Sequence, residues 1–208
     1  MTKSAIITKF HLFMDDSSEL SSSEESDLFD KVYSEICDEM PWEFTRKAFA
    51  GTQSTTVPYV ALPADFAYIL NNRRYTDDYN ENDSPVVFVS SAYTPYKIIN
   101  FADRRQYLNQ NGYAYIDIVN NLLVFTAQPT TAQSVEFDYC ATPTSLALTD
   151  SPAFPSRYHD IIYHYMCIDA FILTQSDKAK SYAAENKARG DAFMQRMKFW
   201  NAQLIRLN

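Results

Sequence analysis

Glycine is scarce in this chain of 208 residues, and it occurs only at positions 51, 112 and 190. Phosphate-binding loops, the dinucleotide-binding GxGxxG turn and the nucleophile elbow of hydrolases each need glycines at close spacing. Glycines this far apart cannot supply any of these turns. The sequence therefore excludes the common nucleotide-binding and hydrolase motifs.

Long apolar runs and paired cysteines are also missing. No apolar stretch approaches the ~18 residues that a membrane-spanning helix needs, and polar residues follow Ile6 and Ile7 where a signal peptide would stay apolar. Cys37, Cys140 and Cys167 are odd in number and widely separated, so we expect three buried thiols and no disulfide framework. These features predict a protein made in the cytoplasm, without membrane association.

Positive charge is in short supply, and the formal net charge is -8. Residues 1–45 carry eleven acidic and three basic residues, whereas residues 156–208 carry five acidic and eight basic ones. A general nucleic-acid binder needs a basic stripe that replaces the counterions of phosphate. This balance argues against such a binder, although it is compatible with DNA sliding through a channel without sticking.

Aromatic residues, in contrast, are plentiful, with 15 Tyr and 14 Phe. An ordinary aromatic core is one explanation. The other is a protein that buries much of its surface against copies of itself, because aromatic side chains are enriched at interfaces. The many tyrosines outside clear core positions favour the second explanation.

Helical periodicity dominates the two ends of the chain. A helix is predicted over residues 27–39, and Pro41 ends it before Trp42 and Phe44 anchor the chain. Residues 2–14 show no settled period and are expected to form a strand or an arm, and Ser17 to Ser26 a mobile loop or a helix start. Two more helices are predicted, over residues 156–175 with Ser156 as N-cap and over residues 177–204 behind Ser176.

The last predicted helix carries a heptad pattern, with small residues toward its start and bulky residues toward its end. This pattern predicts close helix packing near Gly190 and wedge-like packing near Trp200. It comprises Ala179, Ala183, Asn186, Gly190, Phe193, Met197, Trp200 and Leu204.

Strand signals occupy the middle of the chain. The alternation of Val135, Phe137 and Tyr139 with polar neighbours predicts a half-buried strand. A hairpin is expected around Asn120-Asn121, since asparagine tolerates positive φ. Asp103 to Asn109 is expected to be a short helical or turn segment with Arg104 and Arg105 exposed. The predicted strands cover residues 45–49, 56–62, 86–90, 96–99, 113–119, 122–126 and 134–140.

Taken together, these patterns predict an α+β fold. A helical bundle from the N-terminal helix and two C-terminal helices would carry an inserted small antiparallel β-sandwich or open barrel. The expected parts are an N-terminal arm and helix (1–44), a β subdomain (45–142) and a C-terminal helical part (143–208), integrated as one domain.

Several short motifs resemble those of the tailed-phage head–tail adaptor family, which includes connector and tail tubular proteins. The matching pieces are Pro143 to Leu146, Asp150-x-Pro152, Phe154-Pro155, Tyr158-His159, Pro41-Trp42-Glu43, Leu62 to Phe66 and Trp200-Asn201. The resemblance implies a virion structural protein of the phage neck. It further implies a homododecameric ring, with the portal protein on one side and tail or nozzle proteins on the other, around the DNA channel.

No catalytic residue, metal ligand or cofactor is expected, and the candidate residues are ones for packing or for an interface. Arg104, Arg105 and Tyr107 could contact DNA phosphate or an acidic partner, although two arginines on a loop are usually solvated or paired with a neighbouring subunit. The full set is Trp42, Arg104, Arg105, Tyr107, Gly190, Phe193, Met197 and Trp200.

Two alternatives remain open on the sequence. One is another phage neck or tail structural protein, such as a tail terminator. The other is a small metal-dependent hydrolase, because Asp160, His164 and Cys167 fall at i, i+4 and i+7 on one helical face. A calcium loop at residues 77–83 is disfavoured, because it lacks glycine at its sixth position and glutamate at its twelfth.

Overall fold

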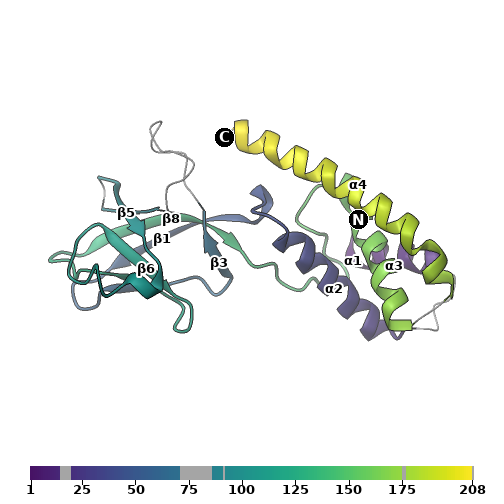
Figure 1. Cartoon of the computed structure of the whole chain (residues 1–208), viewed down its shortest axis with the longest axis horizontal. Coiled ribbons are helices and arrows are strands. Elements are labelled where there is room, and N and C mark those ends of the chain that lie inside the picture. The colour runs from purple at the N-terminus through teal and green to yellow at the C-terminus, as the bar shows by residue number, and fades with distance from the viewer. Residues whose placement is uncertain (15–19, 71–85, 91, 175–176, 208) are drawn as a thin grey trace. The chain divides into compact units, whose positions relative to one another are not determined.

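Helices form from both ends of the chain and strands form from its middle (Figure 1). The computed structural model describes residues 1–14, 20–70, 86–90, 92–174 and 177–207. Two compact units are separated within it: Met1–Thr45 with Pro143–Asn208, here called the helical unit, and Arg46–Thr142, here called the β unit. No helix in the described ranges is both long and apolar enough to span a membrane.

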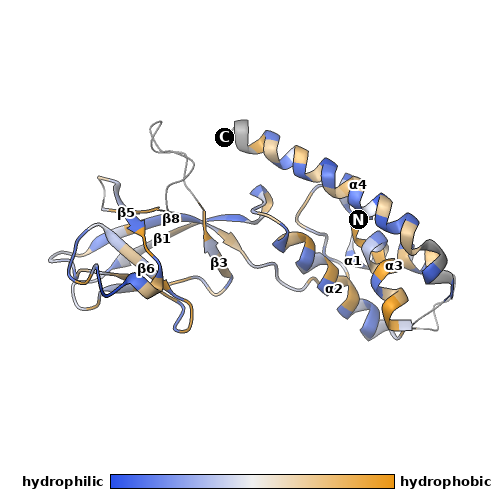
Figure 2. Cartoon of the chain, in the orientation of Figure 1, coloured by the Kyte–Doolittle hydropathy of each residue, from blue (hydrophilic) through white to orange (hydrophobic). Residues whose placement is uncertain are grey.

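The helical unit contains four α-helices among the described residues. They are α1 (Lys3–Met14), α2 (Ser22–Asp38), α3 (Asp160–Thr174) and α4 (Asp177–Leu207), with 3-10 turns at Glu43–Thr45 and Ser156–Tyr158. Apolar residues follow one side of α2 and polar residues the other (Figure 2). The apolar sides meet in one core that includes Ile6, Phe10, Phe29, Ile36, Trp42, Ile161, Met166 and Met197.

Helix α1 replaces the predicted strand or arm, so the sequence-based expectation for residues 2–14 is wrong. Its buried residues recur at helical spacing, but exposed Leu12 and half-exposed Phe13 blur the stripe in the sequence. The first helical N–H groups need acceptors from elsewhere. Those of Lys3 and Ser4 donate to the carbonyls of Asp150 (2.8 Å) and Leu148 (3.0 Å), a distant segment that the local sequence does not reveal.

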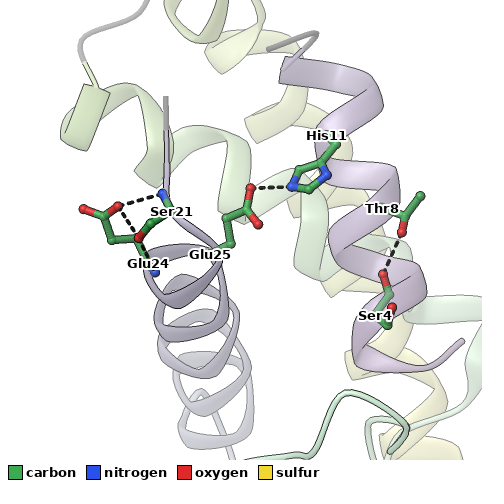
Figure 3. Close-up of polar contacts among 6 residues, drawn as sticks. All are labelled: Ser4, Thr8, His11, Ser21, Glu24 and Glu25. Carbon is green, nitrogen blue, oxygen red and sulfur yellow. Dashed lines mark hydrogen bonds and ion pairs between the residues drawn. The ribbon is translucent and has the colours of Figure 1, made fainter. Parts of the chain in front are cut away.

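Helix α2 begins five residues before the predicted start because Ser21 and Glu24 form a capping box. The Glu24 N–H donates to the Ser21 hydroxyl, and the Ser21 N–H donates back to the Glu24 carboxylate at 2.8 Å. This reciprocal pair satisfies two N–H groups at the start of the helix. Figure 3 shows this cap, and beside it His11 of α1 hydrogen-bonded to the buried Glu25 of α2. Residues 15–19, which include part of the predicted loop, lie outside the described ranges.

The β unit folds into one mixed sheet of eight strands among the described residues. Its path runs β1-β8-β4-β5-β6-β7-β2, and β3 also pairs with β8. The first and last strands of the path lie in contact, so the sheet curls into a nearly closed barrel. The strands are β1 (Arg46–Gln53), β2 (Tyr59–Ala61), β3 (Phe66–Ile69), β4 (Val86–Val89), β5 (Thr94–Ile98), β6 (Tyr113–Asp117), β7 (Leu122–Phe125) and β8 (Gln133–Ala141).

The α+β class with an inserted open barrel is confirmed, and two details of the sheet differ from the prediction. Strand β3 was not expected, and β5 pairs with β6 in parallel, so the barrel is not purely antiparallel. Parallel neighbours need a crossover of about a dozen residues or more, and residues 99–112 supply it. The barrel core comprises Val60, Leu62, Ile69, Val87, Val89, Ala114, Leu123, Phe125, Val135, Phe137, Tyr139 and Ala141.

The predicted hairpin is present between β6 and β7, but its turn is longer than expected. Asp117 pairs with Leu122, so residues 118–121 form a four-residue loop. Within this loop only Asn121 has a positive φ, of 54°. Four-residue loops built on a type I turn leave most of their residues at ordinary angles. The asparagine pair therefore identified the hairpin but not its turn type.

The helix caps of the C-terminal part also need correction. Ser156 is not an N-cap, because it lies inside a 3-10 turn and α3 starts only at Asp160. The residue that caps this turn is Pro155, which makes no side-chain hydrogen bond there. Ser176, the predicted cap of α4, and the disfavoured calcium loop at residues 77–83 lie outside the described ranges.

Candidate interaction surfaces

Trp42, one of the predicted packing or interface residues, lies in the core of the helical unit. It is 1% exposed, and its ring stacks on Phe44 at 5.4 Å between centroids. Its indole N–H donates to the Ile36 carbonyl at 2.7 Å. Ile36 lies in the last turn of α2, where carbonyls have no partner within the helix. Trp42 therefore caps α2 from within the same chain and presents almost no surface to a partner.

The buried side of α4 is rotated from the predicted heptad. Its buried positions are spaced mostly by four residues, as a straight helix packs, whereas the heptad spacing alternates between three and four. The sequence reasoning therefore missed Met194 and Asn201. The buried residues with described side chains are Asn186, Gly190, Met194, Met197 and Asn201.

Gly190 lies against the ring of Tyr165 on α3. A Cβ atom at this position would come within 2.9 Å of the Tyr165 Cε1 atom. The Tyr165 hydroxyl donates to Asp191 at 3.0 Å, which holds the ring over the glycine. Burial, followed by this hydrogen bond to Asp191, raises the pKa of Tyr165. Glycine at position 190 therefore lets the Tyr165 ring approach α4 this closely.

The three bulky residues of the predicted pattern differ in burial. Met197 is fully buried, whereas Phe193 and Trp200 are partly exposed at the edge of the core. The ring of Phe193 stacks on His164 at 5.9 Å, and that of Trp200 lies 6.0 Å from Tyr158. Trp200 therefore packs only partly into the core, in contrast to the expected wedge, and Met197 is the fully buried residue of the three.

Two buried asparagines on α4 bind polar groups from other parts of the unit. His164 of α3 donates from Nδ1 to Asn186 Oδ1 at 2.7 Å. Asn201 Oδ1 accepts from the Glu43 N–H at 2.8 Å, and its Nδ2 donates to the Pro41 carbonyl at 3.2 Å. These hydrogen bonds can form at only one position of α4 along its axis, so they favour that position over shifted ones.

The residues of the hydrolase alternative do not converge. Asp160 is paired with Lys9 at 2.8 Å, while His164 faces Asn186. Burial lowers the pKa of His164 and raises that of Cys167 to about 12, so the histidine is held neutral and the thiol protonated. Across the described residues, no three His, Cys, Asp or Glu side chains are grouped as a metal site would require.

In the β unit, Arg104, Arg105 and Tyr107 belong to the crossover between the parallel strands. Arg104 is not fully exposed as expected, because its guanidinium stacks 3.8 Å from the Phe101 ring centroid and donates to the Phe101 carbonyl. Arg105 is exposed, and Tyr107 packs on Tyr113 at 4.5 Å between ring centroids. Both arginines line a hollow of about 300 Å³, whose apolar lining residues include Pro58, Leu108, Tyr115 and Val124.

The end of the β6–β7 hairpin exposes two large apolar side chains. Ile118 is 83% exposed and Val119 is 93% exposed. The loop is nevertheless held in place: Asp117 accepts hydrogen bonds from the Asn120 N–H (3.3 Å) and from its Nδ2 (2.8 Å), and Asn121 Nδ2 donates to the Leu62 carbonyl at 3.0 Å. We call residues 118 and 119 the hairpin tip.

A groove of about 410 Å³ lies between α2, α3 and α4 in the helical unit. Its floor is apolar, made by Val32, Ile36, Ile168 and Met194. Its rim carries the carboxylates of Glu35, Glu39, Asp169 and Asp191, with Lys198 as the one cation among the described lining residues. The sequence reasoning identified neither this groove nor the hairpin tip, because three separate helices build the first, and the exposure of the second depends on the loop.

A family model described as SU10 adaptor protein matches residues 1–206, which is nearly the whole chain. The search of curated proteins found no match.

Proposed function

The chain belongs to the SU10 adaptor protein family, and we propose that it is a head–tail adaptor subunit that forms a closed ring between the portal and the tail of a phage. The family makes it a phage adaptor, a structural component of the virion, and confirms the resemblance seen in the short sequence motifs. The observation that carries the proposal is the extent of the match, which includes both the helical unit and the β unit.

In this proposal the protein acts by geometry and catalyses no reaction. Copies associate around an axis, twelve by resemblance, and the ring joins the portal protein on one side to tail or nozzle proteins on the other. Genomic DNA passes through the ring without sequence-specific binding. The acidic balance of the chain supports passage, because a wall of like charge does not hold phosphate.

The side-chain environments fit a structural role. His164 and Cys167, candidate metal ligands by their helical spacing, are both buried: His164 faces Asn186, and the Cys167 thiol is protonated. A general base needs access to a substrate proton, and a thiol nucleophile needs an environment that lowers its pKa. Neither group has these properties, so we propose that the subunit is not an enzyme.

The test is the mass of the native assembly, measured by native mass spectrometry with and without the portal protein of the same phage. We expect a complex in which adaptor chains bind the portal as a ring with a fixed whole number of copies. A chain that ignores the portal and binds only the free end of a purified tail tube would instead be a tail terminator, and the proposal would be wrong.

A further inference from the structure

The hairpin tip has the properties of a preformed binding element. A single exposed apolar side chain is ordinary, but here two β-branched residues stand side by side on a loop fixed by hydrogen bonds at both ends. β-Branched side chains also have few rotamers. A partner that receives this tip therefore loses little binding free energy to ordering the loop or its side chains.

The α2–α3–α4 groove has the complementary shape. Its apolar floor is recessed, and it is large enough to accept two aliphatic side chains. The rim residue Glu35 is 62% exposed at its side chain, so a loop can reach the groove past it. A projecting apolar tip and a recessed apolar groove thus occur on the same polypeptide, in its two different units.

The net charges of the two surfaces differ in sign, although that of the groove is small. Four carboxylates and one lysine line the groove. All four carboxylates are paired with lysines: Asp169 and Asp191 with Lys31 and Lys187 at 2.9 Å, Glu35 with Lys31 at 3.8 Å, and Glu39 with Lys198 at 2.5 Å. Four carboxylates against three lysines leave the rim a small negative charge. The hollow beside the hairpin is lined by Arg104 and Arg105 and, among its described lining residues, by no carboxylate. Arg104 lies close enough to Asp117, directly before the tip, to contribute to lowering the pKa of that residue, after the larger effect of Asn120.

We propose that the hairpin tip of one copy docks into the α2–α3–α4 groove of the next copy, with Arg104 and Arg105 facing the acidic rim. This inference rests on the proposed ring, and it names the surfaces that would close it. A contact between two different surfaces of identical chains is heterologous, and repeated around an axis it generates a ring. Two side chains and a charged rim bury much less area than a standard interface, so each contact is weak alone and gains from ring closure.

Disulfide crosslinking between two differently tagged copies tests the contact directly. The native cysteines are all buried, so an introduced cysteine is the accessible thiol. One copy carries Val119→Cys and the other carries Glu35→Cys on the groove rim. The matched control replaces Glu35→Cys by Ala192→Cys, which is equally on the helical unit and exposed but does not line the groove. The expected result is a mixed dimer with Glu35→Cys in about tenfold excess over the control, reflecting a raised local concentration.

A second substitution separates docking from random collision. Adding Ile118→Asp to the Val119→Cys copy places a carboxylate at the apolar floor and should reduce the crosslink to the level of the control. Equal yields from Glu35→Cys and Ala192→Cys, or a yield that Ile118→Asp leaves unchanged, would overturn the docking. A tip cysteine that crosslinks only to added portal protein would overturn it as well.

The outcomes distinguish this inference from the proposed function. If native mass spectrometry shows a ring on the portal while the tip and groove cysteines do not crosslink, the ring exists and closes through other surfaces. If the crosslink forms but the chain does not bind the portal, the self-contact stands and the adaptor assignment to that position is wrong.

Discussion

The two units of the chain treat their buried polar side chains differently. In the helical unit most such side chains bind partners far away in the sequence, as Lys3 does with Asp30 and His164 with Asn186. In the β unit the buried Gln53 Nε2 and Gln133 Oε1 are the two described buried side-chain atoms without a hydrogen-bond partner. Side-chain hydrogen bonds between distant segments therefore contribute most to the arrangement of the helices. Backbone register between strands contributes most to that of the barrel, beside side-chain pairs such as Arg46 with Asp138.

This difference can be tested with the residues already present. Both tryptophans, at positions 42 and 200, and all three histidines, at positions 11, 159 and 164, belong to the helical unit. Tryptophan fluorescence therefore reports on the helical unit, and amide exchange in β8 reports on the β unit. A substitution in the helices should change the first signal much more than the second.

The largest effect is expected from Trp42→Ala. The change removes a fully buried ring and leaves the Ile36 carbonyl at the end of α2 without its indole donor. Truncating a buried tryptophan typically costs about 3–5 kcal/mol in the free energy of unfolding. Urea unfolding followed by the fluorescence of Trp200 measures this loss, and β8 exchange should change little.

Two variants sharpen that result. Trp42→Phe keeps an aromatic ring but removes the N–H donor, so its loss should be smaller, about 1–3 kcal/mol. Trp200→Ala should also cost less than Trp42→Ala, since Trp200 is only partly buried. Equal losses for Trp42→Ala and Trp200→Ala would mean that Trp42 is no more important to the helical core than the partly exposed Trp200.

The second largest effect is expected from Gly190→Leu. A leucine side chain would occupy the position of the Tyr165 ring, which a Cβ atom alone would approach within 2.9 Å, and would break the contact of Tyr165 with Asp191. Overpacking of this kind usually costs about 1–3 kcal/mol. Thermal unfolding of the variant, beside that of Gly190→Ala, measures it.

Gly190→Ala should be nearly neutral, because the gain in helix propensity of about 1 kcal/mol offsets a small shift of the ring. The β unit offers a comparison in Gly51, where a Cβ atom would come within 2.7 Å of the Phe49 ring. Gly51→Ala lacks the helix-propensity gain and should therefore destabilise more than Gly190→Ala. The opposite order would contradict the close packing of Tyr165 on α4.

How much of this fold the sequence predicts depends on how local each signal is. Helix α2 and strand β8 follow from their own periodicity, which a single burial pattern imposes on neighbouring residues. Helix α1 does not, because its N-terminal N–H groups are satisfied by Leu148 and Asp150. The parallel pairing of β5 with β6 was also missed, because pairing between strands leaves little trace in a single strand.

The candidate surfaces show the same limit. Gly190 and Met197 could be placed on the packed side of α4 from spacing alone, but the rotation of that side that buries Met194 and Asn201 could not. Asn201 is fully buried because Pro41 and Glu43 offer backbone groups to it, and these residues are far away in the sequence. The groove depends on three helices at once, so no local pattern could have indicated it.

A smaller and reversible effect is expected from pH. Burial lowers the pKa of His164, and of His159, below the ordinary value of 6.5. The unfolded chain then binds more protons than the folded one below pH 6.5, so stability present above that pH is lost as the pH falls. The slope is at most about 1.4 kcal/mol per pH unit for each histidine. Urea unfolding followed by tryptophan fluorescence at pH 7, 6 and 5 measures it.

The β unit supplies the control for this pH dependence, because its sequence contains no histidine. Its Asp65 has a pKa lowered from 3.8, chiefly by the hydrogen bond from Lys47, so the stability that Asp65 contributes is lost only in more acidic solution. Exchange in β8 should therefore be insensitive to pH between 7 and 5, after correction for the intrinsic rate. The variant His164→Gln should flatten the response of the helical unit, and an unchanged slope would rule out His164 as its source.

The smallest effect is expected from Ser21→Ala at the start of α2. The change removes the hydroxyl that accepts from the Glu24 N–H, and with it half of the capping box (Figure 3). Losing a serine N-cap typically costs about 1 kcal/mol.

The variant Glu24→Gln keeps an acceptor for the Ser21 N–H, so it should cost less than Ser21→Ala, since only the favourable charge at the helix N-terminus is lost. Amide exchange at residues 22–25 measures both. If Ser21→Ala leaves that exchange unchanged while Glu24→Gln accelerates it, the charge of Glu24, and not the reciprocal hydrogen bonds, would fix where α2 begins.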